Sequence, residues 1–79
     1  MYKSEIKYGV NLQLEVDFKV MINELTKVPI EEIDAFSWSS QFEDEIEVKV
    51  NFTFTKDGEE YAHGFHNLIE LREWLMDIF

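Results

Sequence analysis

Cysteine is absent from this chain of 79 residues, and proline and glycine are scarce, with one and three residues. Without cysteine the protein can form neither disulfides nor thiolate metal sites, which suits a reducing compartment. With three glycines, it contains no glycine-rich phosphate loop. No apolar run approaches membrane-spanning length, and the start from Met1 to Glu5 lacks the apolar core of a signal peptide. We therefore expect a single domain, residues 1–79, in the cytoplasm and without a membrane partner.

Basic residues are also few, because seven lysines and arginines stand against seventeen acidic residues and give a formal charge of −10. A charge of this size repels nucleic acids and anionic membranes, so direct nucleic-acid binding is not expected. The same charge favours binding to basic protein surfaces, including those with which proteins hold nucleic acids. The alternative is that an acidic surface only keeps a small protein soluble.

Apolar and aromatic residues are abundant, at 46% and 15%, which is enough for a small folded core. The stretch Ile46–Phe65 predicts a β-hairpin followed directly by the last helix, since every even position from 46 to 54 is apolar. Asp57 and Gly58 suit a two-residue type I′ turn, which would pair Phe54 with Tyr61. A three-residue loop with Gly58 as a bulge is the alternative.

The even positions of Tyr2–Ile22 are also almost all apolar. Because one strand of that length would be unusual, we expect a break at Gly9–Asn11. The strands of this first hairpin would be Tyr2–Tyr8 and Leu12–Ile22. A single bent strand with a bulge at the glycine is the competing interpretation.

The segment between the two hairpins is less regular. Pro29 suits the first turn of a short helix that reaches Phe36. The following residues, Ser37–Phe42, are ambiguous, because Trp38 and Phe42 continue the even parity of the next strand. They could form an early strand or an ordered loop, and their aromatic side chains could be buried or exposed.

The last predicted element is a helix from Asn67 to Phe79. Asn67 is a favourable N-cap, and Glu70 completes a pair similar to a capping box. The apolar side chains cover a wider arc than one sheet contact requires, so the helix either sinks deeply into a curved sheet or has a second contact. A homodimer through Trp74, Ile78 and Phe79 is one form of such a contact.

Together these elements predict an α+β fold. It contains a four-stranded antiparallel sheet from two β-hairpins, with Leu12–Ile22 and Ile46–Thr55 adjacent in the middle. A short helix connects the hairpins, and the C-terminal helix packs on one face of the sheet.

No residue pattern indicates catalysis, a metal or a cofactor. His63 and His66 have a metal-like spacing, but this segment offers no set of four ligands, and we expect His63 to face Phe52 across the hairpin. The serines at 37, 39 and 40 lack a nucleophile elbow and an adjacent base. Most carboxylates fall at polar strand positions or in turns, where they should be solvated rather than enclosed in an apolar pocket. We therefore expect a protein that is not an enzyme.

The distribution of acidic residues is the strongest functional signal. No basic residue lies between Lys27 and Lys49, whereas seven acidic residues do, and a second acidic group surrounds the turn at Gly58. Carboxylates on a rigid frame can reproduce the charge spacing of a phosphate backbone, and an aromatic side chain beside them can anchor an interface. The alternative is a solvated acidic face with inward aromatics. The predicted partner-binding residues are Glu31, Glu32, Asp34, Trp38, Glu43, Asp44, Glu45, Glu47, Asp57, Glu59 and Glu60.

The layout of a hairpin followed by a capped helix, with AHGFHN at 62–67 leading into LREWL at 71–75, resembles that of small phage-encoded anti-CRISPR proteins. The resemblance covers the C-terminal half and carries over no functional residue, because that family has no shared motif. It implies an inhibitor in the host cytoplasm that blocks a nucleoprotein by direct binding, sometimes by imitating DNA. The alternatives are an oligomerising or adaptor module with an apolar interface on the last helix, and an immunity protein or antitoxin against a basic nuclease.

Overall fold

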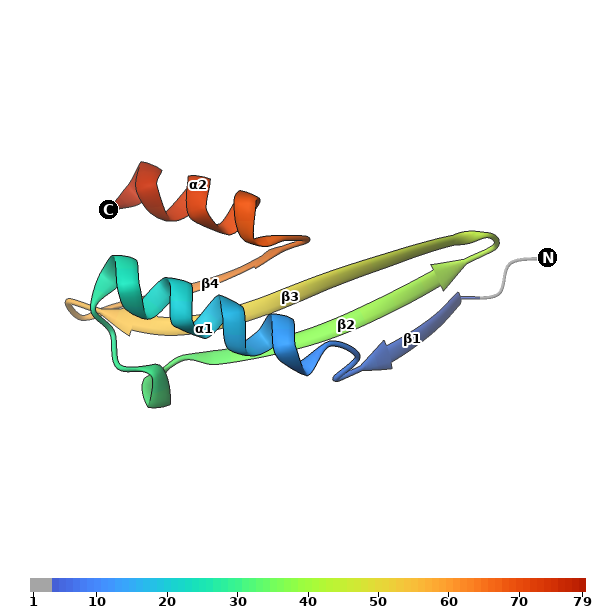
Figure 1. Ribbon diagram of the computed structural model, residues 1–79, viewed down its shortest axis with the longest axis horizontal. Coiled ribbons are helices and arrows are strands. Elements are labelled where there is room, and N and C mark those ends of the chain that lie inside the picture. The colour runs from blue at the N-terminus through green and yellow to red at the C-terminus, as the bar shows by residue number, and fades with distance from the viewer. Residues whose placement is uncertain (1–3) are drawn as a thin grey trace.

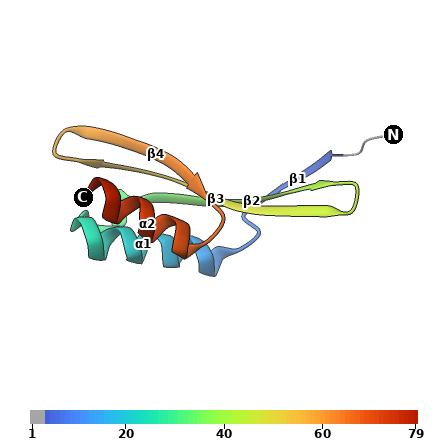
Figure 2. The same cartoon turned by 90° about the horizontal axis from the view of Figure 1, so that it is seen from above.

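The computed structural model describes residues 4–79, which form one four-stranded antiparallel sheet, two α-helices and a short 3-10 helix (Figure 1). The strands lie in the order β1-β2-β3-β4, and both α-helices lie on the same face of the sheet (Figure 2). This arrangement confirms the predicted α+β fold with the C-terminal helix on one face. In chain order the elements are β1 (Ser4–Tyr8), α1 (Leu12–Thr26), η1 (Ile30–Glu32), β2 (Asp34–Phe42), β3 (Glu45–Lys56), β4 (Glu59–Phe65) and α2 (Leu68–Ile78).

The prediction of a strand over Leu12–Ile22 is wrong, because these residues form most of α1. Apolar residues at every second position also include a set at every fourth position, and Leu14, Phe18 and Ile22 form such a stripe along one side of the helix. Asn11 caps the helix, since its side chain accepts a hydrogen bond from the backbone N–H of Leu14 at 3.0 Å. The alternating residues outside the stripe remain exposed, namely Leu12, Val16 and Val20.

The predicted first hairpin therefore does not form, and β1 pairs instead with β2, placing Tyr8 opposite Trp38. The ambiguous segment Ser37–Phe42 belongs to β2, so the two central strands are β2 and β3. The predicted short helix is reduced to η1, and Phe36 already lies in β2. Tyr2, the predicted start of the first strand, lies outside the described residues.

The second hairpin has the predicted register, with Phe54 opposite Tyr61 and Val50 opposite Phe65. Asp57 and Gly58 have φ angles of 53° and 82°, as a type I′ turn requires. The bulged alternative is therefore wrong.

The core lies between the two helices and the half of the sheet near the β3–β4 turn. Trp74 of α2 closes it from one side, with its ring centroid 5.4 Å from that of Phe52. The predicted cap of α2 is confirmed, because the Asn67 side chain accepts a hydrogen bond from Glu70 N at 2.9 Å. The buried apolar residues are Phe18, Ile22, Val28, Ile33, Val50, Phe52, Phe54, Leu71 and Leu75.

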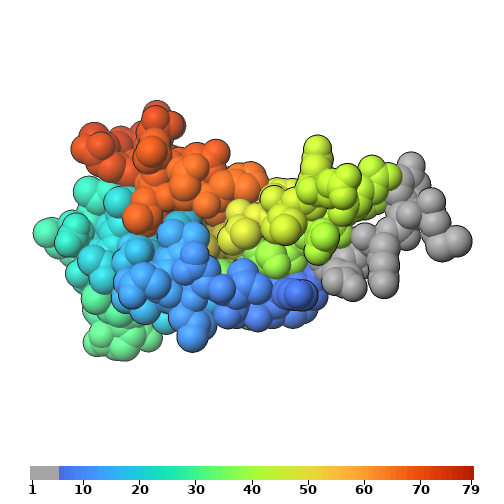
Figure 3. All heavy atoms as spheres, turned by 45° about the vertical axis from the view of Figure 1, so that its right-hand side comes forward, coloured from blue at the N-terminus to red at the C-terminus, as the bar shows by residue number. Residues whose placement is uncertain are grey.

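The molecule is elongated, with extents of 47 × 23 × 21 Å, and the helices cover one half of the sheet (Figures 1 and 2). The uncovered part, residues 4–8 and 38–49, projects beyond them and is called the wing. Figure 3 shows the yellow-green side chains of β2 and β3 extending past both helices. The predicted inward face of β3 is consequently buried only from Val50, whereas Val48 is half-buried and Ile46 is 67% exposed.

Candidate interaction surface on the open face of the sheet

Strand alternation divides the sheet into a face under the helices and an open face. Val50, Phe52 and Phe54 pack against the helices, so the odd-numbered residues of β3 point away from them. Through the register of the ladder, the even-numbered residues of β1, β2 and β4 share that open face. It includes Ile6, Tyr8, Asp34, Phe36, Trp38, Phe42, Glu45, Glu47, Lys49 and Glu60.

An apolar cluster occupies the middle of the open face. Ile6, Tyr8, Phe36 and Trp38, here called the aromatic patch, line a shallow hollow of about 230 Å³ together with Asn51. The ring centroids of Tyr8 and Phe36 are 5.3 Å apart, and these two side chains are 65% and 44% exposed. Trp38 is half-buried, so it is neither a core residue nor a freely exposed anchor. Exposed aromatic side chains of this kind are the groups that protein interfaces favour.

Carboxylates gather at the tip of the wing, where Glu43 and Asp44 form the β2–β3 turn and Glu43 has a φ angle of 56°. Glu45 follows opposite Phe42, which is 44% exposed. Within residues 4–79, none of these three carboxylates forms an ion pair. A groove of about 500 Å³ lies beside the tip, lined by Ser40, Phe42, Glu45, Ile46, Glu47, Val48 and His66.

Glu47, further along β3, differs from the three wing-tip carboxylates because His66 binds it. His66 Nε2 lies 2.7 Å from Glu47 Oε1, and His66 Nδ1 lies 3.3 Å from Glu70 Oε1. The hydrogen bond with Glu47 raises the pKa of His66 above its ordinary value of 6.5. The backbone N–H of His66 donates to Glu70 at 2.8 Å and lowers the pKa of that carboxyl. His66 therefore links the wing to the first turn of α2.

A second acidic group lies at the opposite end of the molecule. Glu32 of η1, Asp34 of β2 and Glu60 of β4 line a hollow of about 250 Å³ with Thr53, Phe54 and Thr55. Glu31 is exposed beside them on η1. We call Glu31, Glu32, Asp34 and Glu60 the turn-end carboxylates, because η1 and the start of β2 lie at the same end of the sheet as the β3–β4 turn (Figure 1).

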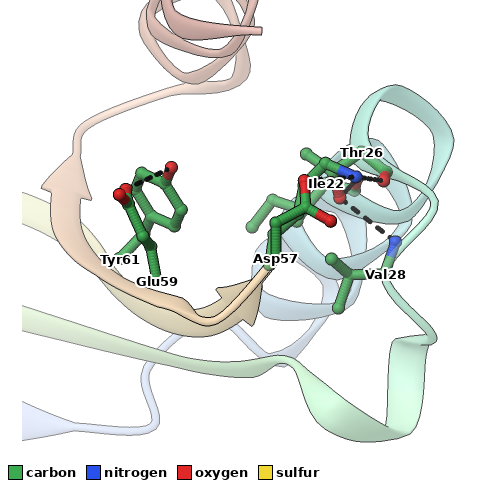
Figure 4. A network of polar contacts seen from close by, with 7 residues as sticks. Ile22, Thr26, Val28, Asp57, Glu59 and Tyr61 are labelled. Atoms are coloured by element: carbon green, nitrogen blue, oxygen red, sulfur yellow. Dashed lines mark hydrogen bonds and ion pairs between the residues drawn. The ribbon is translucent and has the colours of Figure 1, made fainter.

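The other two predicted residues of this end have local partners (Figure 4). Lys56 Nζ lies 3.9 Å from Asp57 Oδ2 and donates a hydrogen bond to the carbonyl oxygen of Thr26 at 2.9 Å. The hydroxyl of Tyr61 donates to Glu59 at 3.1 Å. Both carboxylates therefore support the hairpin as well as adding charge.

The structure thus divides the acidic interval that is continuous in the sequence. Glu31, Glu32 and Asp34 precede β2, whereas Glu43, Asp44 and Glu45 follow it, and a nine-residue strand spans roughly 26 Å. Asp34 instead joins Glu60 from the second acidic group. Sequence reasoning did not identify Ile6, Tyr8 and Phe36 as site residues, although their even parity with Trp38 places them on the same face once β1 is paired with β2.

Ser37 and Glu15 form a polar site that the sequence did not reveal. Ser37 is fully buried, and the Glu15 carboxylate accepts hydrogen bonds from its backbone N–H, at 2.9 Å, and from its hydroxyl. The same hydroxyl accepts a hydrogen bond from Asn11 N at 3.0 Å. The bond from the hydroxyl is the main cause that lowers the pKa of Glu15. Although this serine has a carboxylate beside it, its hydroxyl is enclosed and fully used, so the pair holds α1 against β2.

No family model, curated protein or solved structure matches the chain. Within residues 4–79, no group of three or more histidine, aspartate or glutamate residues could hold a metal ion. In the same part of the chain, no helix is long and apolar enough to cross a membrane.

Proposed function

We propose that this protein is a non-enzymatic acidic binding protein that inhibits a nucleic-acid-binding host protein or complex by occupying its basic surface. The observation that carries this proposal is the open face, where carboxylates at both ends of one sheet flank exposed aromatic side chains. Wing-tip residues without ion pairs lose no internal partner when they meet lysine or arginine. The aromatic patch supplies apolar contact beside that charge.

Charge alone does not make this surface equivalent to DNA. A duplex as long as the 47 Å molecule carries about 28 negative charges, whereas the whole protein has a net charge of −10. An inhibitor of this kind would therefore imitate DNA in the sign of its charge and in part of its spacing. The remaining affinity must come from apolar contacts, which points again to the aromatic patch.

The resemblance to anti-CRISPR proteins gives the proposal its most specific form, a phage-encoded inhibitor acting on a nucleoprotein in the host cytoplasm. An immunity protein or antitoxin against a basic nuclease would use the same surface in the same way. The two forms differ in the target, so binding to a purified CRISPR effector complex and to a free basic nuclease distinguishes them.

A homodimer or adaptor contact through α2 is the second candidate function. Ile78 and Phe79 support it, because they are 41% and 45% exposed. Trp74 does not support it, because its ring packs inside the domain. The centroid of that ring lies 5.1 Å from the ring centroid of His63 and 5.4 Å from that of Phe52. Light scattering at rising salt separates the candidates, because an apolar contact persists or strengthens in salt while an acidic interface weakens.

The proposed inhibitor function is tested by reversing the charge of the wing tip with Glu43→Lys, Asp44→Lys and Glu45→Lys. The matched control reverses three exposed helix carboxylates with Glu24→Lys, Glu73→Lys and Asp77→Lys, so both variants have the same net charge. Probes are an immobilised CRISPR effector complex and a basic nuclease, each free of nucleic acid, at about 50 and 200 mM salt.

We expect the wing-tip variant to lose at least about tenfold in affinity at the lower salt concentration, and the control to lose much less, because only the wing tip is placed in the interface. Equal losses in both variants, or no loss in either, would contradict the proposed function.

A further inference from the structure

We propose that the open face binds an extended segment of the partner, with apolar residues on the aromatic patch and basic residues on either side that reach the two acidic ends. This inference rests on the proposed function, because it specifies the partner of the same surface. The occupant is a segment of a protein. Its middle is apolar, which distinguishes it from a segment that is basic along its whole length.

Strand β2 sets the spacing of the segment. Trp38 lies at the midpoint of β2, with Asp34 four residues away on one side and Phe42 four residues away on the other. At about 3.3 Å per residue, each end is roughly 13 Å from the patch. An extended segment lying along β2 therefore needs basic residues about eight positions apart.

The middle of the face favours apolar residues over basic ones. Lys49 lies directly opposite Trp38 on the open face, so a positive charge is already present there. From their exposed fractions, Ile6, Tyr8 and Phe36 present roughly 300 Å². Such an area is typical of a functional surface patch and is about two fifths of one partner's share, about 800 Å², of a standard interface. Contacts at the acidic ends supply the rest.

Charge complementarity selects this occupant over a second copy of the chain. Stacking two open faces would bring together the carboxylates of two molecules that each have a charge of −10, and a nucleic acid would be repelled in the same way. Arginine suits the ends, because its planar guanidinium binds a carboxylate with two hydrogen bonds and stacks on an aromatic ring. Glu45 lines the groove at the wing tip and offers such a carboxylate.

Two labelled peptides of identical composition test the inference on the full chain by fluorescence anisotropy at low salt. The first carries arginine pairs at its ends and leucine and tryptophan in the middle. The second carries leucine and tryptophan at its ends and the arginines in the middle. We expect the first peptide to bind at least tenfold more tightly. The variant Tyr8→Ser with Phe36→Ser should abolish this preference. The control Ile69→Ser with Met76→Ser, two exposed residues of α2, should retain it.

Equal affinity for the two peptides, or a preference that survives the patch substitutions, would overturn the inference. If the peptides bind equally while reversal of the wing-tip charge still weakens capture of basic proteins, the inference fails and the proposed function stands. If the preference depends on the patch but charge reversal changes nothing, apolar docking is supported and the inhibitor proposal fails.

Discussion

Ser37 joins the start of α1 to the sheet through hydrogen bonds with Asn11 and Glu15. It lies where β1 ends, and its carbonyl oxygen accepts a hydrogen bond from Gly9 N at 2.7 Å. Its backbone N–H points to the side of β2 on which β1 has already ended. The carboxylate of Glu15 therefore supplies the acceptor that a neighbouring strand would otherwise provide. A carboxylate on the first turn of a helix thus completes the hydrogen bonding of a central strand.

Replacing Ser37 with alanine should destabilise the protein by about 1–3 kcal/mol, because the backbone N–H of Asn11 and the carboxylate of Glu15 each lose the buried Ser37 hydroxyl as a partner. Urea denaturation measures the free energy of unfolding. Ser39→Ala, at a half-buried position of the same strand, is the control and should cost much less. A cost for Ser37→Ala no larger than that of the control would show that the hydroxyl contacts of Ser37 contribute nothing.

His66 makes the stability of the protein depend on pH near neutrality. Its pKa is raised in the folded protein by the hydrogen bond with Glu47, so its contribution is fully present below the ordinary value of 6.5. That contribution is lost as pH rises through the folded pKa. We expect NMR titration to give a His66 pKa above 6.5, and Glu47→Gln to lower it. A pKa at or below 6.5 in the unsubstituted protein would exclude this link.

Among the elements, local chemistry predicted the second hairpin and α2, but not α1. The turn residues Asp57 and Gly58 and the cap Asn67 act within a few residues, so the sequence is sufficient to place them. The alternating pattern of Leu12–Ile22 fits both a strand and one stripe of a helix, and Asn11 acts as a helix cap rather than as a loop residue. The pairing of β1 with β2 follows only after α1 has been recognised.

The wing and the covered half of the sheet should differ in local stability. Residues Glu45–Lys49 have no helix above them, whereas Val50, Phe52 and Phe54 lie in the core. Because local opening is easier where few apolar contacts are buried, wing amides of β3 should exchange with deuterium at least about tenfold faster than those of Val50–Phe54. Equal protection along β3 would mean that another contact covers the wing.

At the scale of the whole molecule, the linear order of the acidic residues did not predict their grouping in space. Asp34 and Glu60 lie far apart in the sequence and line one hollow, whereas Asp34 and Glu43 lie close in the sequence at opposite ends of β2. Antiparallel pairing brings residues from different turns together, and a straight strand separates its own two ends. Only the topology shows that the aromatic patch lies between the two acidic groups.

The most direct test of the open face as the binding surface is a titration followed through the backbone amide signals of the isotope-labelled protein. The peptide with arginine pairs at its ends serves as the ligand. Because the open face holds the aromatic patch and both acidic ends, the largest shifts should fall on Ile6, Tyr8, Phe36 and Trp38, with further shifts at the wing tip and near Asp34. Largest shifts on α1 and α2, with β1 and β2 unchanged, would contradict the account.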